Sequence, residues 1–239
     1  MNQTLREKKD IVLTLVRRRL KEAKCPAFDE LLQGSYAMGM GTQPVGKIEF
    51  DIDVGLRFWF RDTDYSATEV RKWIFDAVNG HTDSVEEKGP CTRVGYSKGY
   101  HVDLVAYAHW SEKSGSEEYR LAHRSNGWRP ANPPELLEFV EKARKPFAGT
   151  EDSKTKTDQL RRIVRYLKRW YDVAISYESD AKPSGLEFVL LSIESVQPTR
   201  TWNGQSDDRS ALETLAIAGA NRVGRIVVVH RRQVAVETA

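Results

Sequence analysis

The chain has little cysteine and no long apolar run, and both absences narrow the class of protein. Cys25 and Cys91 are its only cysteines, and they form no CxxC pair or other metal-binding spacing. This excludes a disulfide scaffold and a structural zinc site. No stretch approaches the ~18 apolar residues of a membrane span, and the N-terminus, Met1–Asp10, is polar rather than signal-like. We therefore expect a cytoplasmic protein with two free thiols, a buried and inert Cys91, and no membrane partner.

A strong excess of charge of one sign is also absent. Lys and Arg number 37 and Asp and Glu 34, so the net charge is +3. This balance gives no strong nucleic-acid signal, although it permits a local basic cleft. The 239 residues suffice for one large domain or for two lobes that share a cleft.

The order of the predicted elements indicates an α+β lobe followed by a helical lobe. Apolar periodicity predicts helices at Leu5–Lys24, Ala67–Val78, Glu135–Lys145, Asp158–Ala174, Gly185–Val196 and Ser210–Ala218. Alternation predicts strands at Phe50–Phe60, Thr92–Tyr96 and His101–Tyr107, with Glu117–Arg124 as a short strand or a loop. Ala148–Ser153 reads as a linker, and the tail from Arg222 to Ala239 has no clear period. We expect a core with an N-terminal helix over 1–150 and a helical lobe over 151–239.

Acidic residues mark the polar face of the clearest strand. Asp51 and Asp53 alternate with apolar residues in Phe50–Phe60, so both carboxylates point to one side, about 6.6 Å apart along the backbone. That spacing suits one hard cation or a close pair of them. Asp103, in the next strand-like run, would add a third carboxylate. Taken singly, each of these acids is more typical of the solvated side of a strand. The neighbouring His101 is more typical of a strand histidine whose hydrogen bonds are satisfied within the protein.

A glycine–serine turn, Gly34-Ser35, precedes the acids. Glycine lets backbone N–H groups approach a phosphate closely, and the serine adds a hydroxyl donor. Turns use both residues everywhere, so the pair gains weight only from its order and distance relative to the acids.

Basic residues line one face of the predicted helix Asp158–Ala174. They recur at helical spacing and are Arg161, Arg165, Lys168 and Arg169. This face suits nucleotide phosphates, with Lys168 as the foremost candidate. The alternative is an ordinary solvated helix face.

Together, these segments resemble the DNA polymerase β-like nucleotidyltransferase superfamily. Within it they are most similar to the cGAS/DncV-like nucleotidyltransferases (CD-NTases) of bacterial CBASS anti-phage systems. The resemblance rests on Gly34–Met38, Thr42, Asp51–Gly55, Gly89–Val94, His101–Asp103, Gly127–Pro133 and Leu160–Trp170. Two departures are a longer Gly39-Met40-Gly41 stretch and a helical lobe that we expect to be truncated at its C-terminus.

The resemblance implies a fold, a site and cofactors. The fold is a mixed sheet with helices followed by a helical lobe, with the active site in the cleft between them. Asp51, Asp53 and Asp103 would be the catalytic residues and would hold two Mg²⁺ ions, or Mn²⁺ in their place. Gly34 and Ser35 would cradle the triphosphate. Lys168 and Ser184 would reach its phosphates from the helical lobe.

The implied activity is the synthesis of a cyclic di- or trinucleotide second messenger from NTPs, ATP foremost, in anti-phage defence. Two alternatives share parts of the same site: a template-independent RNA nucleotidyltransferase and a non-catalytic nucleotide-binding sensor. The sequence leaves open the base preference, the ring size, the 2′–5′ or 3′–5′ linkage, the oligomeric state and the need for a protein activator.

Overall fold

The computed structural model describes residues 3–42, 50–174 and 183–217. Spatial proximity divides the chain into two compact units. The first comprises Met1–Met38 and Gln43–Glu138, and the second comprises Gly39–Thr42 and Phe139–Ala239. The division falls inside helix α4 (Pro133–Arg144), ahead of residue 150, where we expect the functional boundary; that boundary stays a prediction. None of the helices in the described ranges is long and apolar enough to cross a membrane.

The first unit contains a mixed seven-stranded sheet. The strands are β1 (Phe28–Leu32), β2 (Phe50–Trp59), β3 (Ser84–Glu87), β4 (Thr92–Tyr96), β5 (Tyr100–Ser111), β6 (Glu117–His123) and β7 (Gly127–Pro130). The order is β1-β2-β5-β4-β3, and β6 pairs with both β5 and β7. Strands β2 and β5 run parallel, whereas the other pairs are antiparallel. The strand with two acids and the strand with the third are therefore direct neighbours.

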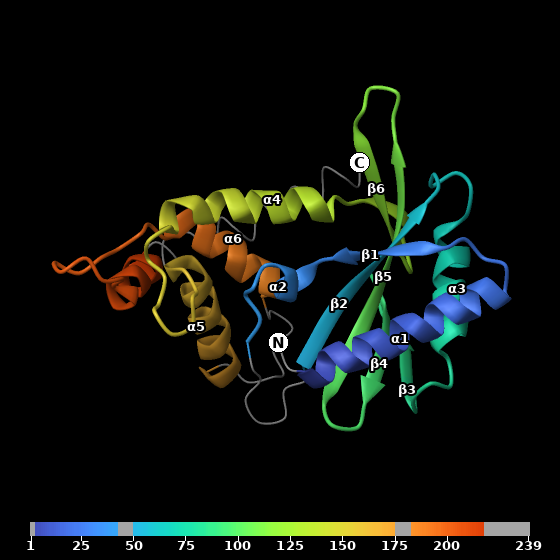
Figure 1. The fold of residues 1–239 in the computed structure, drawn as a ribbon, viewed down its shortest axis with the longest axis horizontal. Coiled ribbons are helices and arrows are strands. Elements are labelled where there is room, and N and C mark those ends of the chain that lie inside the picture. The colour runs from blue at the N-terminus through green and yellow to red at the C-terminus, as the bar shows by residue number, and fades with distance from the viewer. Residues whose placement is uncertain (1–2, 43–49, 175–182, 218–239) are drawn as a thin grey trace. The chain divides into compact units, whose positions relative to one another are not determined.

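Two helices, α1 (Gln3–Glu22) and α3 (Ala67–Val78), pack on one face of this sheet (Figure 1). The core that they cover takes every second residue of the two central strands. These residues are Ile52, Val54, Leu56 and Phe58 of β2 and Val102, Leu104, Ala106 and Ala108 of β5. Because side chains alternate across a strand, Asp51, Asp53 and Asp103 lie on the opposite face.

Several elements match the sequence expectations, and the shortest ones do not. Helix α3 and strand β4 have the expected bounds, and Glu117–Arg124 is a strand rather than a loop over most of its length. Strands β1, β3 and β7 were not among the predicted elements. Each has five residues or fewer and no clear alternation of buried and exposed apolar residues, so the period-2 pattern has too little length to be recognised.

The second unit is helical. It contains the end of α4, a 3₁₀ turn η1 (Lys145–Phe147), α5 (Gln159–Ala174), α6 (Gly185–Ser195) and a helix over 208–217. The predicted helix Ser210–Ala218 thus starts earlier than expected. Its last residue and the tail 222–239 lie outside the described residues.

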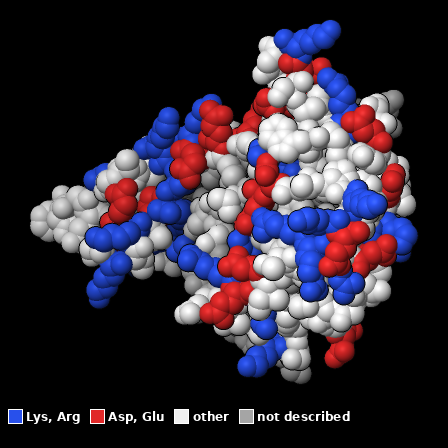
Figure 2. Space-filling view, turned by 45° about the vertical axis from the view of Figure 1, so that its right-hand side comes forward, with Lys and Arg blue, Asp and Glu red and all other residues white. Residues whose placement is uncertain are grey.

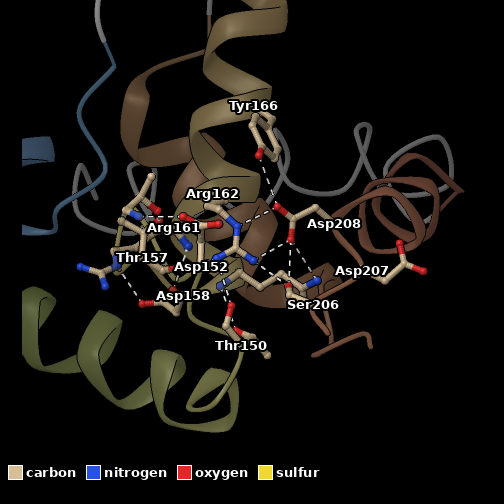
Figure 3. Close-up of polar contacts among 12 residues, drawn as sticks. Thr150, Asp152, Thr157, Asp158, Arg161, Arg162, Tyr166, Ser206, Asp207 and Asp208 are labelled. Atoms are coloured by element: carbon tan, nitrogen blue, oxygen red, sulfur yellow. Dashed lines mark hydrogen bonds and ion pairs between the residues drawn. The ribbon is translucent and has the colours of Figure 1, made fainter. Parts of the chain in front are cut away.

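A buried arginine organises this helical unit (Figure 3). The Arg162 guanidinium on α5 donates to both oxygens of Asp208, at 2.7 and 2.8 Å, and to Ser206. It also donates to the backbone carbonyls of Thr150 and Thr157. One side chain therefore joins α5 to the segment that precedes it and to the start of the last described helix.

Candidate active site

The register of β2 and β5 brings the predicted acids together. Asp53 lies directly beside Asp103, and Asp51 lies beside His101, on the two parallel strands. In-register neighbours on parallel strands point to the same face of the sheet. All three carboxylates therefore share the face opposite the helices α1 and α3.

Burial and neighbouring negative charges change the pKa of Asp53. They raise the pKa of this carboxyl to about 7, with burial as the larger cause, followed by the neighbouring Asp51 and Asp103. Electrostatic interactions with His101 and Arg93 oppose this rise only in part. The site thus holds an excess of negative charge that a bound cation would compensate.

Asp103 differs from Asp53 because Arg93 and His101 already contact its carboxylate. Arg93 of β4 donates to both of its carboxylate oxygens, at 2.9 and 2.8 Å, and His101 Nδ1 lies 3.1 Å from one of them. Burial raises the pKa of Asp103, but the hydrogen bonds from His101 and Arg93 lower it by more. The net shift of this pKa is therefore downward. Asp103 is therefore an ionised, firmly held carboxylate.

The donor atoms suit a hard divalent cation, although they do not enclose one as they stand. All three side chains offer carboxylate oxygens, the ligands that Mg²⁺ prefers, and Mg²⁺ commonly completes its shell with substrate phosphates and water. Within the described ranges, no three acidic, histidine or cysteine side chains converge tightly enough to surround an ion by themselves.

The Gly34-Ser35 turn lies against Asp53. It begins a short helix, α2 (Gly34–Ala37), and Gly34 has φ +67°, which favours glycine. A Cβ atom on Gly34 would lie 2.2 Å from an Asp53 carboxylate oxygen. The backbone of the turn can approach the acids this closely because residue 34 has no side chain, and the half-buried Ser35 follows it in α2.

In the helical unit, the structure brings Lys168 and Ser184 close to each other. A Cβ on Gly185 would lie 3.2 Å from Lys168 Nζ, which also donates to the Met40 carbonyl at 3.2 Å. Ser184 is the N-cap of α6, and its hydroxyl oxygen accepts from the Glu187 N–H. A serine hydroxyl that accepts in this way can still donate its hydrogen to a ligand.

Arg93 is the site residue that we did not predict. It lies in the Gly89–Val94 segment, and the β4–β5 register places it opposite Asp103. Counting back from the Ser97–Gly99 turn across an antiparallel hairpin would have indicated this pairing. His101 is buried against Asp103, which agrees with the expected satisfied strand histidine. Cys91 is buried, as expected, and burial raises the pKa of its thiol to about 12.

Charges of both signs mix on the surface. Figure 2 shows lysine and arginine side chains interspersed with aspartate and glutamate over the face in view, without a continuous field of one sign. The view is in keeping with the small net charge, and the absence of a nucleic-acid partner stays a prediction.

Comparison with known proteins relates the first unit to a nucleotidyltransferase domain. Residues 28–107 match the family model of the cyclic GMP-AMP synthase DncV-like nucleotidyltransferase domain. A cyclic GMP-AMP synthase of Escherichia albertii is 27% identical over 177 residues, which are 70% of this chain and 37% of that protein. This chain therefore spans well under two thirds of that relative.

Solved structures share the fold. The 3′-deoxy GTP-bound form of Escherichia coli DncV has a TM-score of 0.57 at 21% identity, over 70% of this chain and 45% of that one. The Bradyrhizobium diazoefficiens CD-NTase CdnG, in complex with GTP, has a TM-score of 0.56 at 16% identity, over 79% and 64% of the two chains. The matched segment 28–107 contains the turn and all three acids. Over that segment, the chain is similar to the DncV-like nucleotidyltransferase domain.

Proposed function

We propose that the protein is a metal-dependent nucleotidyltransferase that makes a cyclic di- or trinucleotide from NTPs, ATP foremost, as a signal in anti-phage defence. The observation that carries this proposal is the placement of Asp51, Asp53 and Asp103 on one face of two parallel strands, with the Gly34 backbone against Asp53. The relative named above as a synthase, and the neighbours bound to GTP and to 3′-deoxy GTP, support nucleotide substrates.

The residues of the sheet would hold the reacting groups. Asp51, Asp53 and Asp103 would bind two divalent ions, Mg²⁺ or Mn²⁺. Bound metal ions of this kind lower the pKa of an attacking hydroxyl and neutralise charge on the phosphates. Gly34 and Ser35 would receive the triphosphate through backbone N–H groups and the serine hydroxyl. Arg93 keeps Asp103 ionised and fixed in the absence of ligands.

The residues of the helical unit would bind phosphate. Lys168 brings an ammonium group to the start of α6, where the helix dipole also favours negative charge. Ser184 would donate its hydroxyl to the same phosphates. Because the transferred phosphoryl group needs mainly position and charge stabilisation, phosphate ligands of this kind would contribute to the chemistry.

The first experiment incubates the purified full chain with Mg²⁺ and each radiolabelled NTP, singly and in pairs, without nucleic acid. We expect release of pyrophosphate and a phosphatase-resistant product, since a cyclic product has no terminal phosphate. Asp53→Asn should abolish both because it removes a metal ligand. Asp83→Asn is the matched control: it changes an exposed aspartate just before β3 and should leave turnover unchanged.

The outcomes distinguish the proposed synthase from the two alternative functions. Product formation only when an RNA acceptor is added would favour the RNA nucleotidyltransferase. Nucleotide binding without any pyrophosphate release would favour the non-catalytic sensor. Turnover by Asp53→Asn at nearly the wild-type rate would remove the assigned site. Adding a lysate fraction to an inactive sample tests for a protein activator.

A further inference from the structure

The segment Gly39–Thr42, called the strap here, follows the glycine–serine turn closely but belongs to the helical unit. Its Met40 side chain is fully buried. Gly39 has φ +66°, and a Cβ there would lie 3.2 Å from the Arg161 guanidinium. The strap therefore runs tightly along α5, on a path that favours glycine at residue 39.

Two consecutive carbonyls of the strap accept hydrogen bonds from α5. Arg165 Nη2 donates to the Gly39 carbonyl at 2.6 Å, and Lys168 Nζ donates to the Met40 carbonyl at 3.2 Å. Residues three apart on a helix are surface neighbours, so the two side chains bind one short stretch of backbone. The hydrogen bond from Arg165 restrains the backbone at Gly39, and the carbonyl of the following residue, Met40, contacts Lys168.

We propose that Arg165 is a positioning residue for nucleotide binding: it fixes the strap, and the strap's Met40 carbonyl holds the Lys168 ammonium at the start of α6 for the phosphates. This inference rests on the proposed function, because it needs Lys168 to be a phosphate ligand. It adds to that function a residue that acts through another residue rather than on the nucleotide.

Such an arrangement has a clear physical benefit. A lysine side chain is long and flexible, and ordering it during binding costs conformational entropy. A lysine that the protein already holds loses less freedom when phosphate arrives. An ammonium has three donors, so the contact with the Met40 carbonyl does not exclude a phosphate oxygen.

The burial of Arg165 has a cost for the folded protein. Its Nε is buried without a hydrogen-bond partner among the described residues. Burial and the nearby Arg161 lower the pKa of Arg165. Because replacing it relieves these two costs, Arg165→Met should fold, and its effect on binding can be measured.

The test measures binding of inorganic tripolyphosphate by isothermal titration calorimetry on the full chain. This probe has no base, so the unknown base preference does not matter. We expect Arg165→Met and Lys168→Met each to weaken binding about tenfold, in line with the loss of a charged hydrogen bond. The double variant should bind no more weakly than Lys168→Met alone, because Arg165 acts through Lys168. Arg165→Lys, which keeps a cationic donor, should recover part of the affinity.

The control variant is Arg209→Gln, since the Arg209 side chain is 89% exposed on another helix of the same unit; its affinity should equal that of the wild type. Hydrogen exchange supplies a second readout: the amides of the strap should exchange faster in Arg165→Met. Circular dichroism melting confirms that each variant is folded. If Arg165→Met unfolds, the Arg165→Lys series and its double variant with Lys168→Met carry the test.

Three results would overturn the proposal. Additive losses in the double variant would mean that Arg165 binds phosphate directly. Unchanged affinity in Arg165→Met would remove its role, and a wild-type protein that does not bind tripolyphosphate would remove Lys168 as the ligand. Pyrophosphate release from NTPs, measured in parallel, shows whether the proposed function itself stands or fails separately.

Discussion

Asp53→Asn should stabilise the metal-free protein, and the gain should depend on pH. In the folded state the Asp53 pKa is raised from 3.8 to about 7. Between these two pH values the folded protein binds a proton that the unfolded chain has released, so the free energy of unfolding of the wild type falls as the pH rises. Above pH 7 the full cost of the buried negative charge is present.

The size of the effect follows from the shift. The rise of the Asp53 pKa from 3.8 to about 7 corresponds to a loss of up to about 4 kcal/mol of stability. Asparagine has nearly the same shape and no charge, so Asp53→Asn should lack this pH-dependent loss. The stability difference between variant and wild type should be small near pH 4 and should approach that limit at pH 8.

The assay is urea unfolding in EDTA at several pH values from 4 to 8, followed by circular dichroism. Asp83→Asn, at an exposed site, should give a difference from the wild type that does not change with pH. An Asp53→Asn curve that runs parallel to the wild-type curve across this range would refute the argument, because the carboxyl would then titrate normally. Saturating Mg²⁺ should stabilise the wild type at pH 8 more than the variant, because ligands that bind only the folded state stabilise it.

Other changes should act through single contacts. Gly34→Ala should cost about 1–3 kcal/mol in urea unfolding and abolish product formation, because its Cβ would meet the Asp53 carboxylate and the backbone is left-handed there. Arg162→Met should lower the free energy of unfolding by about 3–5 kcal/mol, because it leaves Asp208 without its cation. Gly185→Ala should weaken tripolyphosphate binding several-fold with little change in melting temperature, because the new methyl group displaces the Lys168 amine; equal binding would contradict this.

The sequence predicts the elements that decide the site because they have long, regular patterns. The alternation in β2 identified both the strand and the face of Asp51 and Asp53. The three-residue turn before β5 made β4 and β5 neighbours. These signals are local, so they can be recognised in the sequence without knowledge of the tertiary structure.

Other features depend on partners that are distant along the chain. Strand β1 is short and partly exposed, and it is defined by its pairing with β2 rather than by its own pattern. The salt bridge between Arg93 and Asp103 needs the strand register before it can be inferred. Similarly, the raised pKa of Asp53 comes from burial and neighbouring charges, which composition does not reveal.

The discontinuous make-up of the helical unit bears on how the protein can be cut into pieces. A fragment that starts at residue 139 would lack Gly39–Thr42 and hence the fully buried Met40. The hole left by a missing methionine costs about 2–5 kcal/mol, a large share of the about 5–15 kcal/mol that keeps a domain folded. A soluble fragment would therefore need this tetrapeptide grafted back or an apolar replacement within the helices, and a single cleavage should not yield two independently stable halves.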